Sequence, residues 1–269
     1  MMTFSVLMSI YKNDNPDQLS EAIASTLEQT LPPSQFVIVG DGPLPPELLA
    51  VVDCFSAQHE SIHFVQLGRN IGLGAALNEG LKYCEHDLVA RMDADDICLP
   101  DRFAKQMAFM QAHPEVVVSS GAVQEFDDRT REPIAVRKVP LEHSAIIRVA
   151  RHRNPINHMA TIFRKESVLA LGGYPPLRKA QDYALWSLLL KEGCIMANIS
   201  DLLVRVRTGR GFYERRGISY LRGEISLLRY QKSIGFLSWK DYFINLAIRS
   251  AVRLPPAPIK RLLYKLVRG

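Results

Sequence analysis

Three aspartates stand within four residues of one another in the stretch VARMDADDICLPDRF, residues 89–103. The residues before them are mostly apolar, and burying unpaired carboxylates in an apolar interior is costly. Their side chains therefore either face water at the end of a strand or meet a positive group. A carboxylate cluster of this kind suits Mg²⁺ or Mn²⁺, because these hard cations take oxygen ligands and usually share them with the phosphates of a substrate.

The alternation of a β-strand would direct Asp93 and Asp95 to the same side, so that two carboxylates can serve one ligand. The alternative is an exposed acidic turn that caps the following helix, since Asp favours both turns and helix N-caps. The DxD pattern alone does not decide between the two, and Asp96 is open to either interpretation.

Two further motifs offer groups that a nucleotide could use. VIVGDG sets Asp41 at the end of another apolar run, where its carboxylate can accept a hydrogen bond from a base or a sugar, although Asp-Gly is also a common turn. GRNIGLGAALNEG, residues 68–80, has glycines at the expected start of a helix, which lets a diphosphate approach backbone N–H groups. Because GK[ST] is missing, the segment is not a Walker A loop.

Alternating apolar strands and amphipathic helices would position these motifs. The apolar periodicity predicts strands at 4–10, 35–42, 62–68 and 87–93, separated by helices at 17–29, 46–58 and 74–84. This order predicts a parallel sheet in an α/β protein, and ligands of such sheets bind outside the carboxyl ends of the strands. Asp41, Arg69–Asn70 and Asp93–Asp96 all fall at those ends.

The second half of the chain is less regular. The pattern predicts a helix at 101–112, a strand at 115–127, a strand leading into a short helix within 158–174, a helix at 181–193 and late strands within 195–209. Trp186 and Leu190 are i, i+4 partners that we assign to the core. We expect a solvated loop to carry Glu125, Asp127 and Asp128.

The composition is that of an ordinary soluble globular protein, with 47% hydrophobic and 23% charged residues in 269. Four scattered cysteines, without CxxC or zinc-ligand spacing, predict reduced thiols: Cys54, Cys84, Cys98 and Cys194. The N-terminus lacks the basic region of a signal peptide, and no apolar run approaches the ~20 residues that span a bilayer. We therefore expect a cytoplasmic protein.

Positive charge is concentrated near the C-terminus. From Leu202 onward the chain has 15 Lys or Arg against three acids, a net charge of +12, so that residues 1–201 carry about −7. Residues 242–254 and 259–268 both have amphipathic helical spacing with Lys and Arg off the apolar stripe. Such helices either pack on their own domain or lie on anionic lipid at the inner face of the cell membrane.

Taken in order and spacing, the motifs resemble the family 2 inverting glycosyltransferases with a GT-A fold, of the bacterial exopolysaccharide and lipopolysaccharide type. The segments that carry the resemblance are SVLMSIY, VIVGDG, RNIGLGAALNEGL, ARMDADDICLPDRF, INHMATIFRKESVLALGGY and AQDYALW. The resemblance implies a GT-A domain over residues 1–210, with a Rossmann-like, mostly parallel sheet flanked by helices. Residues 211–269 would form a basic helical extension.

The resemblance implies a donor site for a nucleoside-diphosphate sugar, and we expect a UDP-sugar. Asp41 corresponds to the acid that binds uracil, Asp93 to the acid near the ribose and sugar, and Asp95 to the acid that reaches the divalent cation, Mn²⁺ or Mg²⁺. The implied donor-binding residues are Ser9, Tyr11, Asp41, Arg69, Asn70 and Asp93.

The resemblance also implies the reaction. Asp182 corresponds to the catalytic base, which takes a proton from an acceptor hydroxyl as that oxygen attacks the anomeric carbon; a metal offsets charge on the departing diphosphate. One displacement at that carbon inverts its configuration. The implied acceptor is a lipid-linked saccharide, and no nucleic-acid partner is expected.

Some positions depart from the family pattern. Gln181–Asp182 stands where the family often has Glu-Asp, and Gly40–Asp41–Gly42 where it often has Asp-Asp-Gly, so the acid assigned each role is present. Arg207 stands near a position where relatives carry a His; Arg cannot ligate a cation but can pair with a phosphate. His158 either lines the acceptor or diphosphate site or is a structural histidine.

Two other function classes stay open on the sequence. A nucleotidyltransferase also sets acids at parallel-strand ends, but it has no use for a base at Asp182 and usually carries a basic, Gly-rich signature after its first strand, which SIYKNDN lacks. A catalytically silent sugar-nucleotide binder or scaffold would not need Asp182 either. The presence of Asp182 therefore favours the glycosyltransferase.

Overall fold

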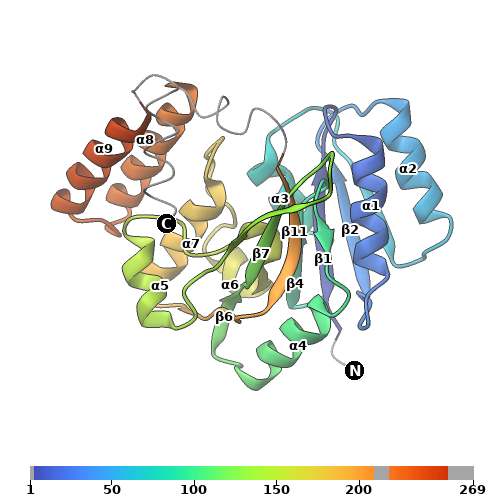
Figure 1. Cartoon of the computed structure of the whole chain (residues 1–269), viewed down its shortest axis with the longest axis horizontal. Coiled ribbons are helices and arrows are strands. Elements are labelled where there is room, and N and C mark those ends of the chain that lie inside the picture. Colours follow the sequence, from blue (N-terminus) through green and yellow to red (C-terminus); the bar gives the residue numbers. More distant parts are fainter. Residues whose placement is uncertain (1–2, 209–217, 254–269) are drawn as a thin grey trace.

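The computed structural model of the chain describes residues 3–208 and 218–253 (Figure 1). Within them the main sheet has seven strands, in the order β10-β6-β9-β4-β1-β2-β3. The four parallel neighbours are β4 (Leu88–Met92), β1 (Ser5–Ile10), β2 (Gln35–Gly40) and β3 (Ile62–Gln66). Antiparallel β9 (Ile162–Arg164) joins them to β6 (Val116–Ser119) and the edge strand β10 (Ile195–Met196). The predicted mostly parallel α/β sheet is confirmed.

Helices cover both faces of this sheet, because successive strand residues point to opposite sides. On β1, Val6 and Met8 face one apolar core and Leu7 faces the other. The first core is covered by α1 (Pro16–Leu27), α2 (Pro46–Ser56) and α4 (Arg102–Ala112). The second is covered by α3 (Leu73–Leu81), α5 (His143–Ala150), α6 (Lys165–Ala170) and α7 (Gln181–Lys191). Trp186 and Leu190 belong to the second core, as predicted.

A second, smaller sheet was not predicted. Its strands, in spatial order, are β5 (Ile97–Cys98), β11 (Leu202–Thr208), β7 (Ala122–Asp127) and β8 (Pro133–Arg137). The single strand predicted at 115–127 is therefore wrong, since it breaks at Ser120–Gly121 into β6 and β7. Ser120 donates its backbone N–H to Asn198 Oδ1 at 2.9 Å, and a Cβ at Gly121 would lie 2.8 Å from the Asp201 carbonyl oxygen. The segment before β11, which includes Asn198 and Asp201, therefore lies against Ser120 and Gly121, where a single strand would have continued.

The strand predicted to begin near His158 is also shorter than expected. Residues His158–Ala160 form a 3₁₀ turn, η1, and β9 begins only at Ile162. The Ala160 and Thr161 backbone N–H groups donate to the carbonyls of Asn157 and His158, so these residues satisfy their backbone locally instead of in the sheet.

Two helices follow the small sheet, α8 (Ile218–Ser233) and α9 (Trp239–Arg253). Leu227 of α8 packs with Tyr183 of α7, and Gln231 Nε2 donates to Ser187 Oγ at 2.7 Å. None of the helices in the described ranges has the length and apolarity needed to cross a bilayer. The helix predicted at 259–268 and the domain boundary at residue 210 lie outside the described residues, so both stay predictions.

Candidate functional site

Strand register brings three of the sequence motifs to one edge of the main sheet. Ile10 pairs with Gly40, and Met8 pairs with Met92, the last residue of β4. A cavity of about 410 Å³ opens beyond these strand ends. It is lined by Ser9, Tyr11, Asp14, Asp41, Asn70, Gly72, Leu73, Arg91, Asp93, Ala94 and Asp95. Among the predicted donor-binding residues, Arg69 is the one that does not line it; Arg69 is exposed on the surface.

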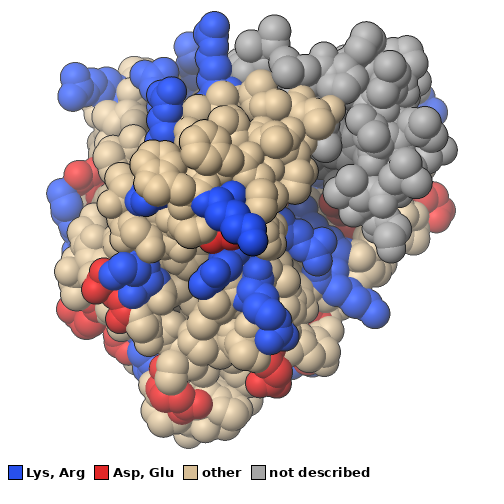
Figure 2. Space-filling view, turned by 90° about the vertical axis from the view of Figure 1, so that its left-hand side faces the viewer, with Lys and Arg blue, Asp and Glu red and all other residues tan. Residues whose placement is uncertain are grey.

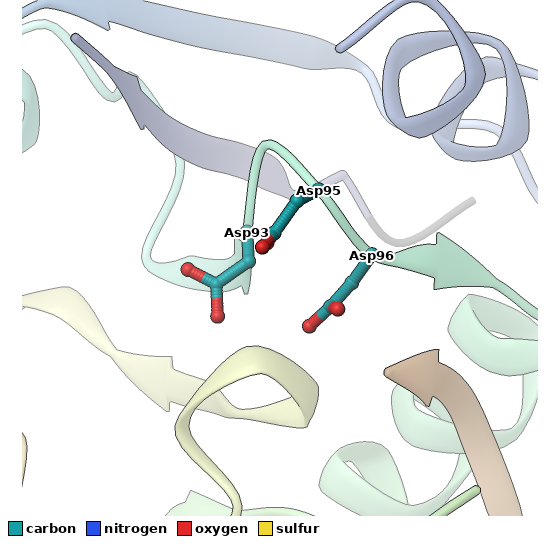
Figure 3. Close-up of side chains that lie close together, drawn as sticks. All are labelled: Asp93, Asp95 and Asp96. Atoms are coloured by element: carbon teal, nitrogen blue, oxygen red, sulfur yellow. The ribbon is translucent and has the colours of Figure 1, made fainter. Parts of the chain in front are cut away.

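The three aspartates lie on a turn directly after β4, hereafter the aspartate turn, residues 93–96 (Figure 3). Asp93, Asp95 and Asp96 each offer a carboxylate oxygen, and these oxygens lie within 4.8 Å of one another. Because the strand already ends at Met92, a turn brings the carboxylates together, where strand alternation had been expected. The turn also brings in Asp96, so the cluster has three acids instead of the predicted pair.

Asp96 does not cap the following helix, which corrects one of its two interpretations. Helix α4 begins at Arg102, its N-cap residue is Asp101, and no side chain caps it. Asp96 is instead buried, and its Oδ1 accepts a hydrogen bond from the Arg207 backbone N–H at 3.1 Å. Burial, reinforced by Asp93 and Asp95, raises the pKa of Asp96 well above its usual value.

The aspartate turn fits a hard divalent cation. Burial and the neighbouring Asp93 carboxylate raise the pKa of Asp95 to about 6. Carboxylates this close to one another repel each other when all of them are ionised, and a bound cation offsets that repulsion. The ligand atoms offered are all oxygens, which favours Mg²⁺ or Mn²⁺ over metals that prefer sulfur or imidazole.

Arg91 is a site residue that the sequence analysis missed. It lies on β4 with 1% of its surface exposed, lines the cavity and forms an ion pair with Asp93. Burial lowers the pKa of Arg91, but the Asp93 carboxylate, together with Tyr174 and Asp96, outweighs burial, so that the pKa is raised. Within the described residues its Nε has no hydrogen-bond partner. The available signal was a charged residue inside an otherwise apolar strand.

Asp41 organises the loop that follows β3. Its Oδ1 accepts from the Ile71 backbone N–H at 2.7 Å, and its Oδ2 accepts from the Gly72 N–H at 3.0 Å and from Asn70 Nδ2 at 2.9 Å. The loop also approaches Gly42, where a Cβ would lie 2.5 Å from the Asn70 backbone nitrogen. The VIVGDG and RNIG motifs therefore form one structural unit in the cavity wall.

Asp182 lies in the first turn of α7 and does not line the cavity. Its Oδ2 accepts a hydrogen bond from Asn154 Nδ2 at 2.8 Å. Burial raises the pKa of Asp182, although hydrogen bonds from the Tyr183 backbone and from Asn154, and the charge of Arg91, act in the opposite direction. A carboxylate with a raised pKa is a stronger proton acceptor, which suits a general base.

The surroundings of His158 fit the structural interpretation. Its ring is buried, with Nε2 at 2.9 Å from Tyr174 Oη and an edge contact with the Trp186 ring. Burial, assisted by the charge of Arg91, lowers the pKa of His158 well below its usual value, so the ring is neutral at physiological pH. His158 does not line the cavity.

Arg207 holds the aspartate turn from the side of the small sheet. Its Nε donates to the Asp95 carbonyl oxygen at 2.6 Å, and its guanidinium forms ion pairs with Glu21 of α1 and with Asp128. A contact with a phosphate would require Arg207 to exchange these partners. Asp128 thus belongs to the network around the site, and Glu125 is buried on β7, so the predicted solvated loop is wrong for Glu125.

Comparisons with known proteins agree on one family. Residues 5–171 match the family model described as Glycosyl transferase family 2. The chain is 41% identical over 266 residues to the amylovoran biosynthesis glycosyltransferase AmsE of Erwinia amylovora, covering 97% of this chain and 98% of that one. It is 38% identical over 265 residues to the UDP-Gal:alpha-D-GlcNAc-diphosphoundecaprenol beta-1,3-galactosyltransferase of Escherichia coli, covering 98% and 96%.

Among solved structures, the fold resembles that of the mannosyltransferase PcManGT from Pyrobaculum calidifontis in complex with GDP-Man and Mn²⁺. The TM-score is 0.65 at 16% sequence identity, over 100% of this chain and 81% of that one. At this identity the likeness concerns the fold.

Proposed function

The chain belongs to glycosyl transferase family 2, and from that premise we propose that it transfers a sugar from a UDP-sugar to a hydroxyl of a lipid-linked saccharide, with inversion at the anomeric carbon. The observation that carries the proposal is one cavity at the strand ends, in which Asp41 and the aspartate turn meet and which Arg91 links to Asp182. A catalytically silent sugar-nucleotide binder would need the cavity but not a base at Asp182. The Asp182 carboxylate, whose pKa is raised by burial and which feels the charge of Arg91 in the cavity wall, supports catalysis.

The nucleoside end of the donor would lie against Ser9, Tyr11 and Asp41. Tyr11 is 42% exposed beside the cavity, and an exposed aromatic ring can stack on a base. The described structure shows one hydrogen bond to Asp41 Oδ1, from Ile71 N–H. A carboxylate oxygen accepts two, so Oδ1 can also accept the N–H of uracil. The name of the Escherichia coli relative, which specifies UDP-Gal, supports a uridine nucleotide.

The diphosphate end of the donor would lie at the aspartate turn. Asp95, together with Asp93 and Asp96, would hold Mn²⁺ or Mg²⁺, and the Mn²⁺ complex of the archaeal mannosyltransferase supports this choice. When bound, such a cation offsets the negative charge of the departing diphosphate. Arg91 adds a fixed positive charge in the cavity wall, and Arg207 keeps the turn in place through the Asp95 carbonyl.

Asp182 would act as the base on the acceptor. Its carboxylate takes the proton of the acceptor hydroxyl while that oxygen attacks the anomeric carbon, and the bond from this carbon to the diphosphate oxygen breaks. The products are the glycosylated acceptor and UDP. Because the nucleophile enters opposite the leaving group in a single step, the configuration at the carbon inverts. Asn154 orients the carboxylate through its hydrogen bond to Oδ2.

A second cavity of about 340 Å³ offers room for the acceptor. It shares Asn70, Gly72 and Leu73 with the first cavity, and its far wall is formed by residues 175–178. Gly74 lies in its wall, and the side chain of Gln181, the residue before Asp182, packs against Gly74. An acceptor in this cavity would therefore lie near the start of α7, which carries the proposed base.

The acceptor class follows from the relatives. The name of the Erwinia amylovora relative assigns it to the synthesis of a polysaccharide, and that of the Escherichia coli relative specifies GlcNAc linked to diphosphoundecaprenol. We infer that this chain likewise extends a lipid-linked saccharide in surface polysaccharide synthesis. Such an acceptor is held in a membrane, so the enzyme would act in the cytoplasm at its inner face.

The proposal is tested by incubating the full chain and Mn²⁺ with a panel of UDP-sugars and a synthetic GlcNAc-diphosphate-lipid. We expect release of UDP together with a disaccharide whose new linkage has the opposite anomeric configuration to the donor, as read by NMR. Asp182→Asn should abolish transfer, and the exposed control Asp53→Asn should not. Binding of UDP-sugars without transfer to any acceptor would favour the silent binder, and failure to bind any nucleotide would refute the proposal.

A further inference from the structure

Helix α9 turns its apolar side to the solvent. Trp239, Phe243, Ile244 and Ile248 are 62%, 59%, 40% and 55% exposed. Their spacing of i, i+4, i+5 and i+9 puts them on one side of the helix, here named the α9 apolar face. An ordinary surface helix buries such a stripe against its own core.

The opposite side of α9 is attached to the domain by polar contacts. Asn245 is 2% exposed, and its Nδ2 donates to the Arg151 carbonyl oxygen at 2.7 Å. Arg249 Nη2 donates to the His152 carbonyl oxygen at 3.4 Å. A buried Asn with a specific partner fixes the rotation of the helix, because any other rotation would break this hydrogen bond. The outward direction of the apolar face is therefore built into the fold.

Cationic side chains lie at the Trp239 end of this face. Lys232 Nζ lies 4.7 Å from the centre of the Trp239 ring, and Lys240 is exposed next to Trp239. Figure 2 looks at this side of the molecule and shows an area without charged side chains that is bordered by Lys and Arg. Helices α8 and α9 together carry the cations Arg222, Arg229, Lys232, Lys240, Arg249 and Arg253 against the acids Glu224 and Asp241.

We propose that the α9 apolar face is the surface with which the protein docks on a membrane that contains anionic lipid. Trp and Phe enter the interface between headgroups and acyl chains, while lysines beside them meet lipid phosphates. Lipid is favoured over a second copy of the chain, because two copies joined through this face would bring their lysines together. Lipid is also favoured over residues 254–269 as the partner of this face. The sequence of that segment has four Lys or Arg and no acid, so it would add positive charge next to the same lysines.

The purpose of docking through α9 rests on the proposed function, but the docking itself does not. It would hold the enzyme at the surface where the headgroup of a lipid-linked acceptor is found. The affinity for the membrane itself depends on the α9 apolar face and its lysines, and it can be measured without donor, acceptor or metal.

The test uses the full chain and vesicles of phosphatidylglycerol and phosphatidylcholine, with vesicles of phosphatidylcholine alone for comparison. At low salt we expect the protein to sediment with the anionic vesicles and the fluorescence of Trp239 to shift to shorter wavelength. The other tryptophan, Trp186, is fully buried and gives a constant background. Lys232→Gln and Lys240→Gln should each weaken binding about fivefold, with a weaker salt dependence.

A triple variant tests the apolar face directly. Phe243→Ser, Ile244→Ser and Ile248→Ser together should lower vesicle binding at least about tenfold, because they remove the surface that enters the lipid. The matched control replaces Ile134 and Val136, two exposed apolar residues of β8, by Ser and should bind as the parent does. Calorimetry with UDP should give the parent affinity in all variants, so a failure of docking is distinguishable from a failure of the proposed function.

Four results would overturn the proposal. The parent could ignore anionic vesicles at low salt, or the triple variant could bind them as well as the parent. A parent dimer that the triple variant disperses, without vesicle binding, would assign the face to a second copy. A large loss of thermal stability in the triple variant, without parent vesicle binding, would show that the chain covers this face itself.

Discussion

The Arg91 guanidinium forms an ion pair with the Asp93 carboxylate where β4 ends and the aspartate turn begins. Arg91 is 1% exposed, so one buried positive charge stands among several acids. Its charge lowers the pKa of Asp95 and Asp182, while burial, the larger effect on both, raises them. Arg91 therefore connects the proposed metal side of the site with the proposed base.

Replacing Arg91 should test this connection. Arg91→Met leaves Asp93 without its partner, and breaking a buried ion pair from one side typically costs about 3–5 kcal/mol of unfolding free energy. Arg91→Lys keeps the charge without the planar guanidinium and should lose less. Urea denaturation measures both. Lys82→Met, which breaks the exposed pair with Glu79, is the control and should cost less than about 1 kcal/mol. Equal stability of Arg91→Met and parent would contradict the argument.

Removing Asp95 should separate a metal site from a plain acidic turn. We expect Asp95→Ala to weaken UDP binding strongly in Mn²⁺ and little in EDTA, because Asp95 would act through the cation. Calorimetry under both conditions measures this difference. The nearby exposed acid Asp101 provides the control, since Asp101→Ala should leave UDP binding unchanged in either condition. An equal loss for Asp95→Ala with and without metal would favour the acidic turn.

The edge of the main sheet was predictable from local patterns. Apolar runs end at Ile10, Gly40 and Met92, and parallel strands bring such ends together, so the order of motifs was enough to group Ser9, Asp41 and the aspartate turn. The same reasoning did not find Asp14, whose motif SIYKNDN has no periodicity. Asp14 lines the cavity, and burial raises its pKa to about 6.

The small sheet and the charged network were beyond such patterns. Strand β5 has two residues, and its partner β11 follows about a hundred positions later, with Val204 opposite Cys98. No local period encodes this pairing. Arg207 depends on it, since its bonds to the aspartate turn exist only once β11 lies beside β5. The sequence therefore indicated that Arg207 was of interest without indicating its partners.

Asp182→Asn should keep the fold and the donor affinity but lose sugar transfer. An amide has nearly the same shape as a carboxylate and cannot take a proton, and loss of a general base typically costs ~10²–10⁴-fold in rate. Single-turnover transfer and UDP calorimetry measure the two properties separately. Glu192→Gln, at the exposed end of the same helix, is the control. Transfer by the Asn variant at the parent rate would show that Asp182 is not the base.

The pH dependence of transfer should follow Asp182. A base works in its ionised form, so the rate should fall with decreasing pH through a pKa above that of an ordinary Asp, since burial raises this pKa. The Asn154 hydrogen bond favours the ionised form, and Asn154→Ala should therefore move the acid limb of the rate profile to higher pH. Gln58→Ala, on the surface after α2, serves as control. An unmoved limb in Asn154→Ala would separate this pH dependence from Asp182.

The last prediction concerns Gly42, whose φ of +88° belongs to the left-handed region. Ala at this position should cost about 1–2 kcal/mol of stability for its conformation alone. Gly172 has a φ of +86° with no atom within 4 Å of an added Cβ, so Gly172→Ala isolates that cost. At Gly42 the Cβ would also displace the backbone of Asn70, 2.5 Å away, and with it the loop that Asp41 holds.

Thermal denaturation should therefore show at least as large a loss for Gly42→Ala as for Gly172→Ala, whereas UDP binding should weaken about tenfold or more in Gly42→Ala alone. The reason for the difference is geometric: the loop cannot move away from Cβ and still keep the Ile71 and Gly72 N–H groups on the Asp41 carboxylate. The effect should persist in EDTA, because this wall does not include the aspartate turn. If both variants bind UDP as the parent does, the unit of Asp41 and its loop does not shape the nucleotide site.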